Sequence, residues 1–226
     1  MEKTKTLITL DDVMKNPKVR AYIIKADEQL AALGYTEHGE RHAKIVAKNV
    51  GIILSKLGYP ERVVELGKIA GYLHDIGNVI NRNGHAEIGA LLAQNILSEM
   101  GMDPVEIGDI MMAIGNHHEE DGTPVSEMAA ALIIGDKADV HRSRVRKEGA
   151  DIQNDIHDRV NYAATFSKIF VYPEKRLIKL DIKIDTKISS IGEYFEIFLS
   201  RMILSSKAAK VLKCNYELWI NDVKMF

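Results

Sequence analysis

Residues 70–80 read AGYLHDIGNVI, and this stretch decides the fold. The apolar residues that lead into it recur at helical spacing, which predicts a helix ending in the doublet His74-Asp75, with Gly77 as a natural helix stop. Adjacent helical residues diverge by about 100°, so both side chains reach one metal only near a helix end or where the carboxylate bridges two ions. A bridging Asp75 satisfies that geometry. The alternative is a histidine favoured by the helix dipole beside a solvated aspartate.

Helical patterns continue on both sides of this stretch. Between Pro17 and about His157, apolar spacing and frequent cap and stop residues predict six or seven helices joined by short loops. From residue 161 the pattern alternates like strands around a hairpin turn at Tyr172-Pro173-Glu174-Lys175, and a helix and a closing strand follow. We therefore expect a mainly α fold in two domains, a helical bundle (1–160) and a small ββαβ appendage (161–226).

Other residues of metal-ligand type lie on apolar faces or at the ends of further predicted helices. His38 and His42, four residues apart, share one helix face. Asp136 lies inside an apolar face, and because we expect Lys137 to point elsewhere, a metal ion is the expected partner of this carboxylate. Any single histidine has the alternative of a buried hydrogen-bonding role. The candidate metal ligands are His38, His42, His74, Asp75, His85, His117, His118 and Asp136.

Several charged neighbours of these residues have alternative explanations. Asp139 shares part of the face that carries the candidate ligand, and it could instead pair with Arg142. The two acids at 119–120 are expected in a solvated loop. The basic run at 141–146 is explained by a solvated helix end at least as well as by substrate binding.

The overall composition excludes several classes of function. The chain has 226 residues, of which 30 are basic and 32 acidic, and its net charge of −2 gives no global attraction to nucleic acid or to anionic membranes. No apolar run approaches the roughly 20 residues of a membrane span, and the amino terminus lacks a signal-peptide core. The single Cys214 excludes an internal disulfide. We expect a cytoplasmic protein that can form a homodimer and that binds neither a membrane nor a nucleic-acid duplex.

Five segments carry the candidate ligands in a fixed order. They are EHGERHAKIVAKNV (37–50), AGYLHDIGNVI (70–80), GHAEIGALLA (84–93), AIGNHHEEDG (113–122) and ALIIGDKADV (131–140). Over roughly residues 36 to 146 the chain thereby resembles the HD-domain superfamily of metal-dependent phosphohydrolases. The resemblance implies that a first metal is bound by His42, His74, Asp75 and Asp136.

The additional histidines are similar to those of the HD-GYP-like branch of that superfamily. The resemblance implies that a second metal position is completed by His85, His117 and His118. His38 falls where some members place a further ligand. Asn78 stands in place of a phosphate-holding lysine, and Thr123-Pro124 replaces the tripeptide that names the branch. These departures argue against cyclic dinucleotide cleavage and leave the metal centre intact.

A dinuclear phosphohydrolase is the leading hypothesis. Two ions roughly 3.5–4 Å apart activate a bridging water and polarise phosphoryl oxygens. Asp75 and Lys137 are the expected catalytic residues, and Arg82, Lys137 and Arg142 are the expected phosphate-binding residues. The expected substrate is a small phosphorylated molecule, a nucleotide, cleaved at a phosphomonoester or phosphodiester bond. One or two divalent ions are expected, and Mn, Fe, Mg, Ni and Co remain open.

Two other classes of function compete with hydrolysis. A non-catalytic module that senses nucleotide or metal would bind its ligand without turning over a phosphoester. An iron-dependent oxygenase would consume oxygen with iron and show no such activity with manganese.

Overall fold

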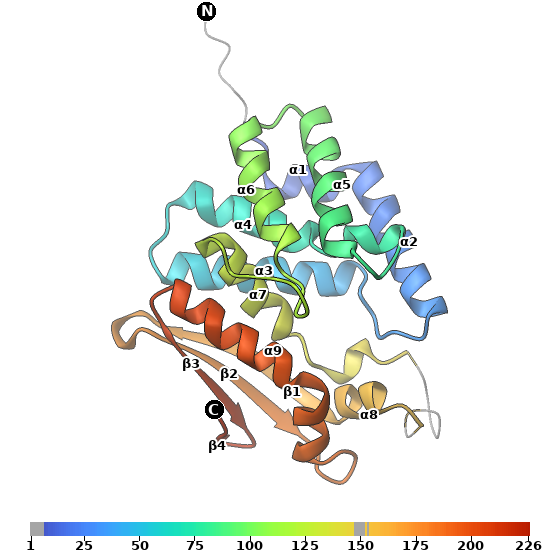
Figure 1. Ribbon diagram of the computed structural model, residues 1–226, viewed down its shortest axis with the longest axis vertical. Helices are drawn as coiled ribbons and strands as arrows, with labels where there is room; N and C mark the ends of the chain where they lie inside the picture. Colours follow the sequence, from blue (N-terminus) through green and yellow to red (C-terminus); the bar gives the residue numbers. More distant parts are fainter. Residues whose placement is uncertain (1–6, 147–151, 153) are drawn as a thin grey trace, which may run out of the picture.

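The computed structural model describes residues 7–146, 152 and 154–226, and it shows a mainly α fold with one small sheet (Figure 1). The helices are α1 (Leu10–Lys15), α2 (Pro17–Ala32), α3 (Glu40–Lys56), α4 (Glu61–Leu73), α5 (His85–Glu99), α6 (Pro104–Gly115), α7 (Glu127–Lys137), α8 (Ile156–Ala163) and α9 (Ile191–Val211). Short 3₁₀ turns are η1 (Ile76–Val79), η2 (Arg142–Arg144) and η4 (Pro173–Lys175). The strands are β1 (Ala164–Tyr172), β2 (Leu177–Ile184), β3 (Asn215–Ile220) and β4 (Val223–Lys224). The predicted fold class is confirmed.

The helix ends follow the cap and stop residues of the sequence. The side chain of Asn16 accepts hydrogen bonds from the first turn of α2, which begins at Pro17. Gly34 and Gly58 have φ of 84° and 81° and end α2 and α3 in the left-handed conformation that glycine adopts without steric cost. Asp103 caps α6 in the same way as Asn16 caps α2. Local chemistry therefore sets where these helices start and stop.

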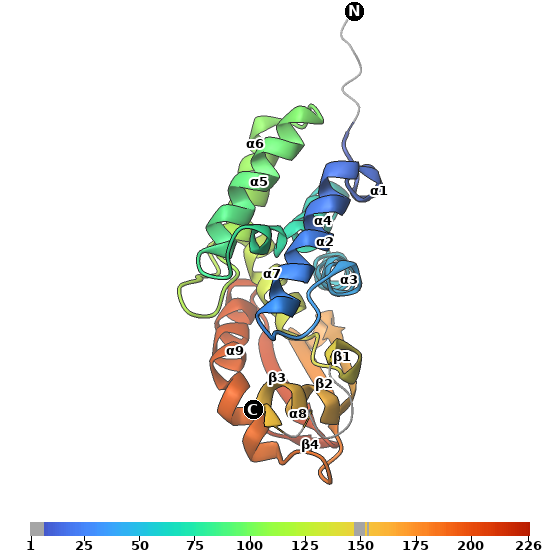
Figure 2. The same cartoon turned by 90° about the vertical axis from the view of Figure 1, so that its right-hand side faces the viewer.

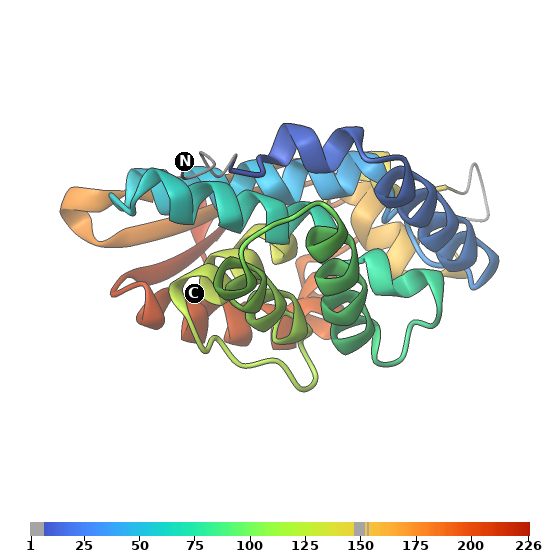
Figure 3. The same cartoon turned by 90° about the horizontal axis from the view of Figure 1, so that it is seen from above.

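The centre of the molecule is built from α3, α4 and α7. Figure 3 shows α3 and α4 running side by side. Small residues on α4 allow this close approach, because a Cβ at Gly71 would lie 3.0 Å from the Cα of Ala47, and one at Gly67 would lie 2.5 Å from a methyl group of Leu54. The buried apolar side chains of all three helices belong to one core cluster. Their polar ends meet at one edge of that core.

The carboxy-terminal sheet has the order β1-β2-β3-β4 and lies at the end of the molecule opposite α5 and α6 (Figure 2). The hairpin β1-β2 is antiparallel, α9 connects β2 to its parallel neighbour β3, and β4 adds a short antiparallel edge. The ββαβ order is confirmed, with β4 as an addition. Residues 161–163 are not strand as expected, since Asp155 caps α8 and the helix runs to Ala163.

The sheet and α9 pack directly onto the helical part. Helix α9 contacts α7, and the hydroxyl of Ser167 on β1 donates a hydrogen bond to the carbonyl oxygen of Ala138 at 2.6 Å. One apolar core cluster includes buried residues of both parts. The division near residue 160 stays a prediction. Among the described residues, none of the helices combines the length and apolar composition that crossing a bilayer requires.

Candidate metal centre

Five segments bring the predicted ligands to one place. They are the start of α3 with His42, the end of α4 with His74 and Asp75, the start of α5 with His85, the residue His117 after α6, and the end of α7 with Asp136. All four of these histidines are buried, and the two carboxylates are nearly so. Because these helices share one apolar core, the helix ends that carry the predicted ligands lie close together at the edge of that core.

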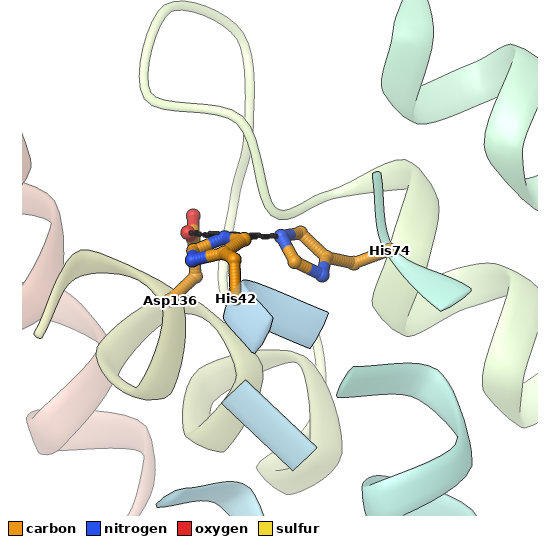
Figure 4. Close-up of side chains that lie close together, drawn as sticks. All are labelled: His42, His74 and Asp136. Carbon is orange, nitrogen blue, oxygen red and sulfur yellow. Dashed lines mark hydrogen bonds and ion pairs between the residues drawn. The ribbon is translucent and has the colours of Figure 1, made fainter. Parts of the chain in front are cut away.

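The first group of donor atoms comes from His42, His74 and Asp136. The Nε2 atom of His42 lies 3.3 Å from Nε2 of His74 and 3.3 Å from Oδ1 of Asp136. The Nε2 atom of His74 lies 3.7 Å from the same carboxylate oxygen. Figure 4 shows these side chains pointing toward one another. Ligands about 2.1 Å from a divalent ion lie roughly 3.0–3.4 Å apart, so this group has the spacing of a metal site.

Asp75 joins this group to a second one. Its Oδ2 atom lies 3.3 Å from Nε2 of His74 and 3.7 Å from Nε2 of His42. Its Oδ1 atom faces the other way, 3.4 Å from Nε2 of His85 and 3.9 Å from Nε2 of His117, and these two nitrogens are 3.3 Å apart. One carboxylate oxygen therefore faces each histidine pair. This is the arrangement that a carboxylate bridging two metal ions requires.

The tautomers of the histidines also suit metal binding. His74, His85 and His117 place Nδ1 at 2.9, 2.9 and 2.6 Å from backbone carbonyl oxygens, and His42 places it 2.7 Å from Asp139. A carbonyl oxygen only accepts, so Nδ1 must carry the hydrogen in the first three rings. In a neutral ring the lone pair then lies on Nε2, the atom that faces the centre. Hydrogen bonds of this kind orient imidazole ligands in metalloproteins.

The two nearly buried carboxylates of the centre favour a bound cation. Burial opposes the charged ring of His74, yet Asp75 and Asp136 raise its pKa to about 10. Burial lowers the pKa of His85 to about 4, and burial together with the neighbouring His74 holds the pKa of His117 well below its usual value. Without a metal, a proton on His74 and the ammonium group of Lys137, 2.7 Å from Asp136, are the positive charges next to the two carboxylates. A divalent ion would replace that proton, and His85 and His117 are already in the neutral form that ligates.

Comparison with known proteins identifies the fold family. The HD domain family matches residues 39–154, which are 116 of the 226 residues. This chain belongs to the HD domain family. The match contains all the residues of the two donor groups.

Individual relatives of this HD-domain protein cover it only in part. An uncharacterized protein of Methanocaldococcus jannaschii is 29% identical over 169 residues, 65% of each chain. Ribonuclease Y of Lawsonia intracellularis is 36% identical over 103 residues, 44% of this chain and 17% of that protein. Ribonuclease Y of Mycoplasma mycoides is 34% identical over 122 residues, 51% of this chain and 26% of that protein. The chain spans less than two thirds of the length of these curated relatives.

A solved structure is also similar to this chain. The crystal structure of a predicted HD superfamily hydrolase from an uncultured Thermotogales bacterium covers 59% of this chain and 75% of that chain. The sequence identity is 24%, and the TM-score is 0.46.

His38 and His118 flank the two donor groups of the HD domain without belonging to them. The ring centre of His38 lies 5.4 Å from that of His42, and the ring centre of His118 lies 4.8 Å from that of His85. His38 donates from Nδ1 to the carbonyl oxygen of Thr36 at 2.7 Å, as the inner histidines do. Nδ1 of His118 instead accepts from a backbone N–H at 3.4 Å. Ligation by these two residues stays a prediction.

Lys137 lies inside the centre, so the expectation that it points away from Asp136 was wrong. Its ammonium group is 2.7 Å from Oδ2 of Asp136, 3.0 Å from Glu119 and 3.0 Å from the carbonyl oxygen of His117. The four-carbon side chain bends back at the end of α7, which residue spacing alone does not reveal. Glu119 is likewise not in a solvated loop, because it pairs with both Lys137 and Arg201.

Asp139 does not pair with Arg142, as considered from the sequence. Its carboxylate contacts Arg41 at 3.0 Å and His42 at 2.7 Å, and Arg144 lies 3.8 Å away. Arg142 instead lies over the ring of Tyr162, 5.1 Å from its centre. Arg142 is not among the described residues that line the cavity or the recess beside the centre, and its expected role in phosphate binding stays a prediction.

Beside the donor groups lies a small recess lined by Asp75, His117 and Asp136, and this recess shares His85, Arg144 and Arg201 with a larger cavity of about 520 Å³. Helices α8 and α9 contribute one wall, and the loop before α3 and the start of α5 contribute the others. Arg82 lines it as predicted, with Nη1 4.0 Å from Oδ1 of Asp75 and the guanidinium 5.6 Å from the ring centre of Tyr35. Arg144 and Arg201 also line it. Nothing in the sequence distinguishes Arg201 from the other cations of α9. Arg144 belongs to the basic run 141–146, and it is buried rather than part of a solvated helix end.

Proposed function

We propose that this HD-domain protein is a metal-dependent phosphohydrolase that cleaves a phosphoester bond of a nucleotide. The observation that carries the proposal is the placing of Asp75, with one carboxylate oxygen facing each of two histidine pairs. This centre lies beside a cavity rather than in a closed core, because His85 lines both the cavity and the recess that Asp75 and Asp136 line. Ligands that converge beside an accessible space are typical of a catalytic metal site.

The donor set suits two divalent ions. His42, His74, Asp75 and Asp136 would hold one ion. Asp75, His85 and His117, whose donor atoms lie 3.3, 3.4 and 3.9 Å apart, would hold the other. Imidazole nitrogen and carboxylate oxygen bind manganese, iron, nickel, cobalt and zinc, so the donors do not select one metal. Ions bound here would lower the pKa of water and polarise a phosphoryl oxygen, which is the chemistry that phosphoester hydrolysis requires.

The surrounding side chains hold these donors in fixed orientations. Asp139 fixes the ring of His42 through Nδ1 at 2.7 Å. Lys137 holds Oδ2 of Asp136 at 2.7 Å and leaves Oδ1 facing the two histidines. Lys137 is 2% exposed and already has three acceptors, so we assign it to positioning the ligand. Preorganised ligands of this kind avoid a reorganisation cost when the reaction occurs.

The cavity supports a substrate of nucleotide size. Its volume of about 520 Å³ lies within the range of small-molecule sites. Arg82, which lines both the cavity and the recess, is placed to contact a phosphate. On the α8 wall, the amide of Asn161 donates to the carbonyl oxygen of His157 at 2.8 Å, which fixes which way the amide points. Its Oδ1 atom is buried and has no partner within the described chain, and it can accept from an amino or hydroxyl group of a substrate.

Metal analysis and a phosphoester panel test this proposal. We expect protein purified without chelators to hold close to two metal equivalents per chain, and His74→Ala and His117→Ala to hold fewer. Each metal is then restored separately, and turnover is measured on nucleoside monophosphates, nucleotide polyphosphates, cyclic dinucleotides and short RNA, the last because ribonuclease Y is among the relatives. Metal binding without turnover of any phosphoester would overturn the proposal and favour a sensor. Oxygen uptake with iron would favour an oxygenase.

A further inference from the structure

Two arginines from distant parts of the chain meet beside the metal centre. Arg144 lies in η2, directly after the helical bundle, and Arg201 lies in the middle of α9, within the carboxy-terminal segment. Both line the same inner recess as Asp75 and Asp136. The packing of α9 against α7 brings them together. The recess is therefore completed by a residue that lies outside residues 39–154, the part matched by the HD domain family.

Arg144 is held rigidly and has one unused donor group. The residue is 3% exposed. Its Nε donates to the carbonyl oxygen of Glu37 at 3.1 Å, and Nη1 donates to that of Asp139 at 2.8 Å. Its Nη2 is buried and has no hydrogen-bond partner among the residues that the structure describes. A buried N–H without an acceptor is costly, and in a recess next to a reaction centre it indicates that a ligand supplies the acceptor.

Arg201 adds a second positive charge at the same recess. Its Nε donates to Glu119 at 3.0 Å, and its guanidinium lies 4.8 Å from the ring centre of Phe198. Glu119 also pairs with Lys137 at 3.0 Å, so one carboxylate serves two cations. Burial and the charge of Arg201 hold the pKa of Arg144 below its usual value, although the carboxylate of Asp139 acts in the opposite direction. Each guanidinium group has one nearby carboxylate, Glu119 for Arg201 and Asp139 for Arg144, and two positive groups that face one recess favour an anion bound between them.

We propose that Arg144 and Arg201 together bind a terminal phosphate of the substrate, and that the enzyme is therefore a phosphomonoesterase. This inference rests on the proposed function for the reaction, and on the two arginines for the substrate class. A phosphomonoester carries three terminal oxygens and up to two negative charges, whereas a phosphodiester carries two such oxygens and one charge. The two arginines and the metal centre together present more positive groups than the two oxygens of a diester can contact. An arginine can donate two hydrogen bonds to one phosphate, and the three oxygens of a terminal phosphate offer more acceptors for such contacts than the two of a diester.

Titration with inorganic phosphate tests the anion site without any turnover. The whole 226-residue chain, as purified, is titrated calorimetrically alongside Arg201→Gln and the control Lys207→Gln, an exposed cation on the same helix. We expect Arg201→Gln to weaken phosphate binding at least tenfold and Lys207→Gln to leave it unchanged. Because Arg144 also supports the fold, Arg144→Lys is used in place of a neutral substitution, and it should weaken binding as well. Equal phosphate affinity in the wild type and Arg201→Gln overturns the proposal.

Substrate selectivity provides the second readout. With metal restored, the wild type should prefer a nucleoside monophosphate to the matching dinucleotide, and Arg201→Gln should raise KM for the monophosphate at least tenfold while changing the diester rate little. A wild type that prefers the diester overturns the substrate class. If no phosphoester is hydrolysed but Arg201→Gln still weakens phosphate binding, the hydrolase proposal fails and the anion site stands. If hydrolysis occurs and Arg201→Gln changes neither readout, the anion site fails and the hydrolase proposal stands.

Discussion

The side-chain amide of Asn78 donates a hydrogen bond to Oδ1 of Asp75 at 3.0 Å, and it also donates to the carbonyl oxygen of Asp75 at 2.9 Å. Asn78 is completely buried. Since the other carboxylate oxygen faces His74, this contact fixes the rotation of the group that joins the two donor sets. Where the resemblance leads one to expect a lysine for phosphate, this chain has a residue that orients a ligand.

Replacing Asn78 should weaken the second metal position more than the first. In Asn78→Ala, Oδ1 of Asp75 loses its donor and the carboxylate can rotate away from His85. Loss of a residue that orients a ligand typically costs 10- to 100-fold in metal affinity, roughly, and we expect a loss of that size for one of the two equivalents. Competition with a chelator measures both affinities. Asn95→Ala, an exposed asparagine on α5, is the control and should bind both equivalents normally.

Asp139 should contribute to stability as well as to metal binding. Its buried carboxylate contacts Arg41, His42 and Arg144, and although burial opposes ionisation, the hydrogen bond with His42 and the charge of Arg144 hold its pKa well below the usual range. Asp139→Asn leaves the buried Arg144 without this counter-charge, which typically costs about 3–5 kcal/mol. Denaturant unfolding measures the loss. The exposed Asp121→Asn should change the free energy of unfolding by less than about 0.5 kcal/mol.

Gly77 should not tolerate a side chain. A Cβ there would lie 2.0 Å from the carbonyl oxygen of His85 and 2.5 Å from the backbone nitrogen of Gly89. Both contacts are backbone, so the start of α5 would have to move, and we expect Gly77→Ala to cost about 3 kcal/mol or more and to displace His85. Gly108→Ala is the matched control, since its Cβ meets nothing within 4 Å and alanine favours a helix by roughly 0.5–1 kcal/mol. Thermal unfolding of both variants tests this prediction, and equal melting temperatures for Gly77→Ala and Gly108→Ala would contradict it.

The start of α9 should give a pH-dependent contribution to stability. Hydrogen bonds from Arg159, the backbone of Ser190 and the hydroxyl of Ser189 lower the pKa of Glu193 to about 2. Because the folded pKa lies below the unfolded value of about 4.3, this contribution is fully present above the unfolded pKa and is lost as pH falls through about 2.

Comparing melting temperatures across pH tests the contribution of Glu193. At pH 7, Glu193→Gln should melt below the wild type, and the difference should shrink as the pH is lowered from about 4 toward 2. Glu196→Gln, an exposed acid one turn further along α9, serves as the control and should show no such convergence. A difference that stays constant down to pH 2 would show that Glu193 acts through its shape rather than its charge.

The sequence by itself determined the helices and most of the donors. Asn16, Gly34 and Gly58 set helix ends through local hydrogen bonds and backbone conformation, which depend only on neighbouring residues. The apolar spacing that leads into His74 and Asp136 showed that these residues follow buried helix faces. The alternation in β2 predicted its buried face for the same reason, since the period of a strand is fixed.

Only the tertiary structure decided which charges meet at the centre. Periodicity gives the face on which a residue lies but not which helix is placed against that face, so the sequence contained no sign that α9 would bring Arg201 to the ligands. Long side chains can also bend away from the direction in which their Cα–Cβ bond points. Lys137 bends back to Asp136 although helical geometry directs the two residues to different faces. Glu119 lies between Lys137 and Arg201 because both cations are within reach in the folded chain. Local rules thus place the candidate donors on buried helix faces, and the packing of α9 on α7 brings the arginine pair of the proposed anion site beside them.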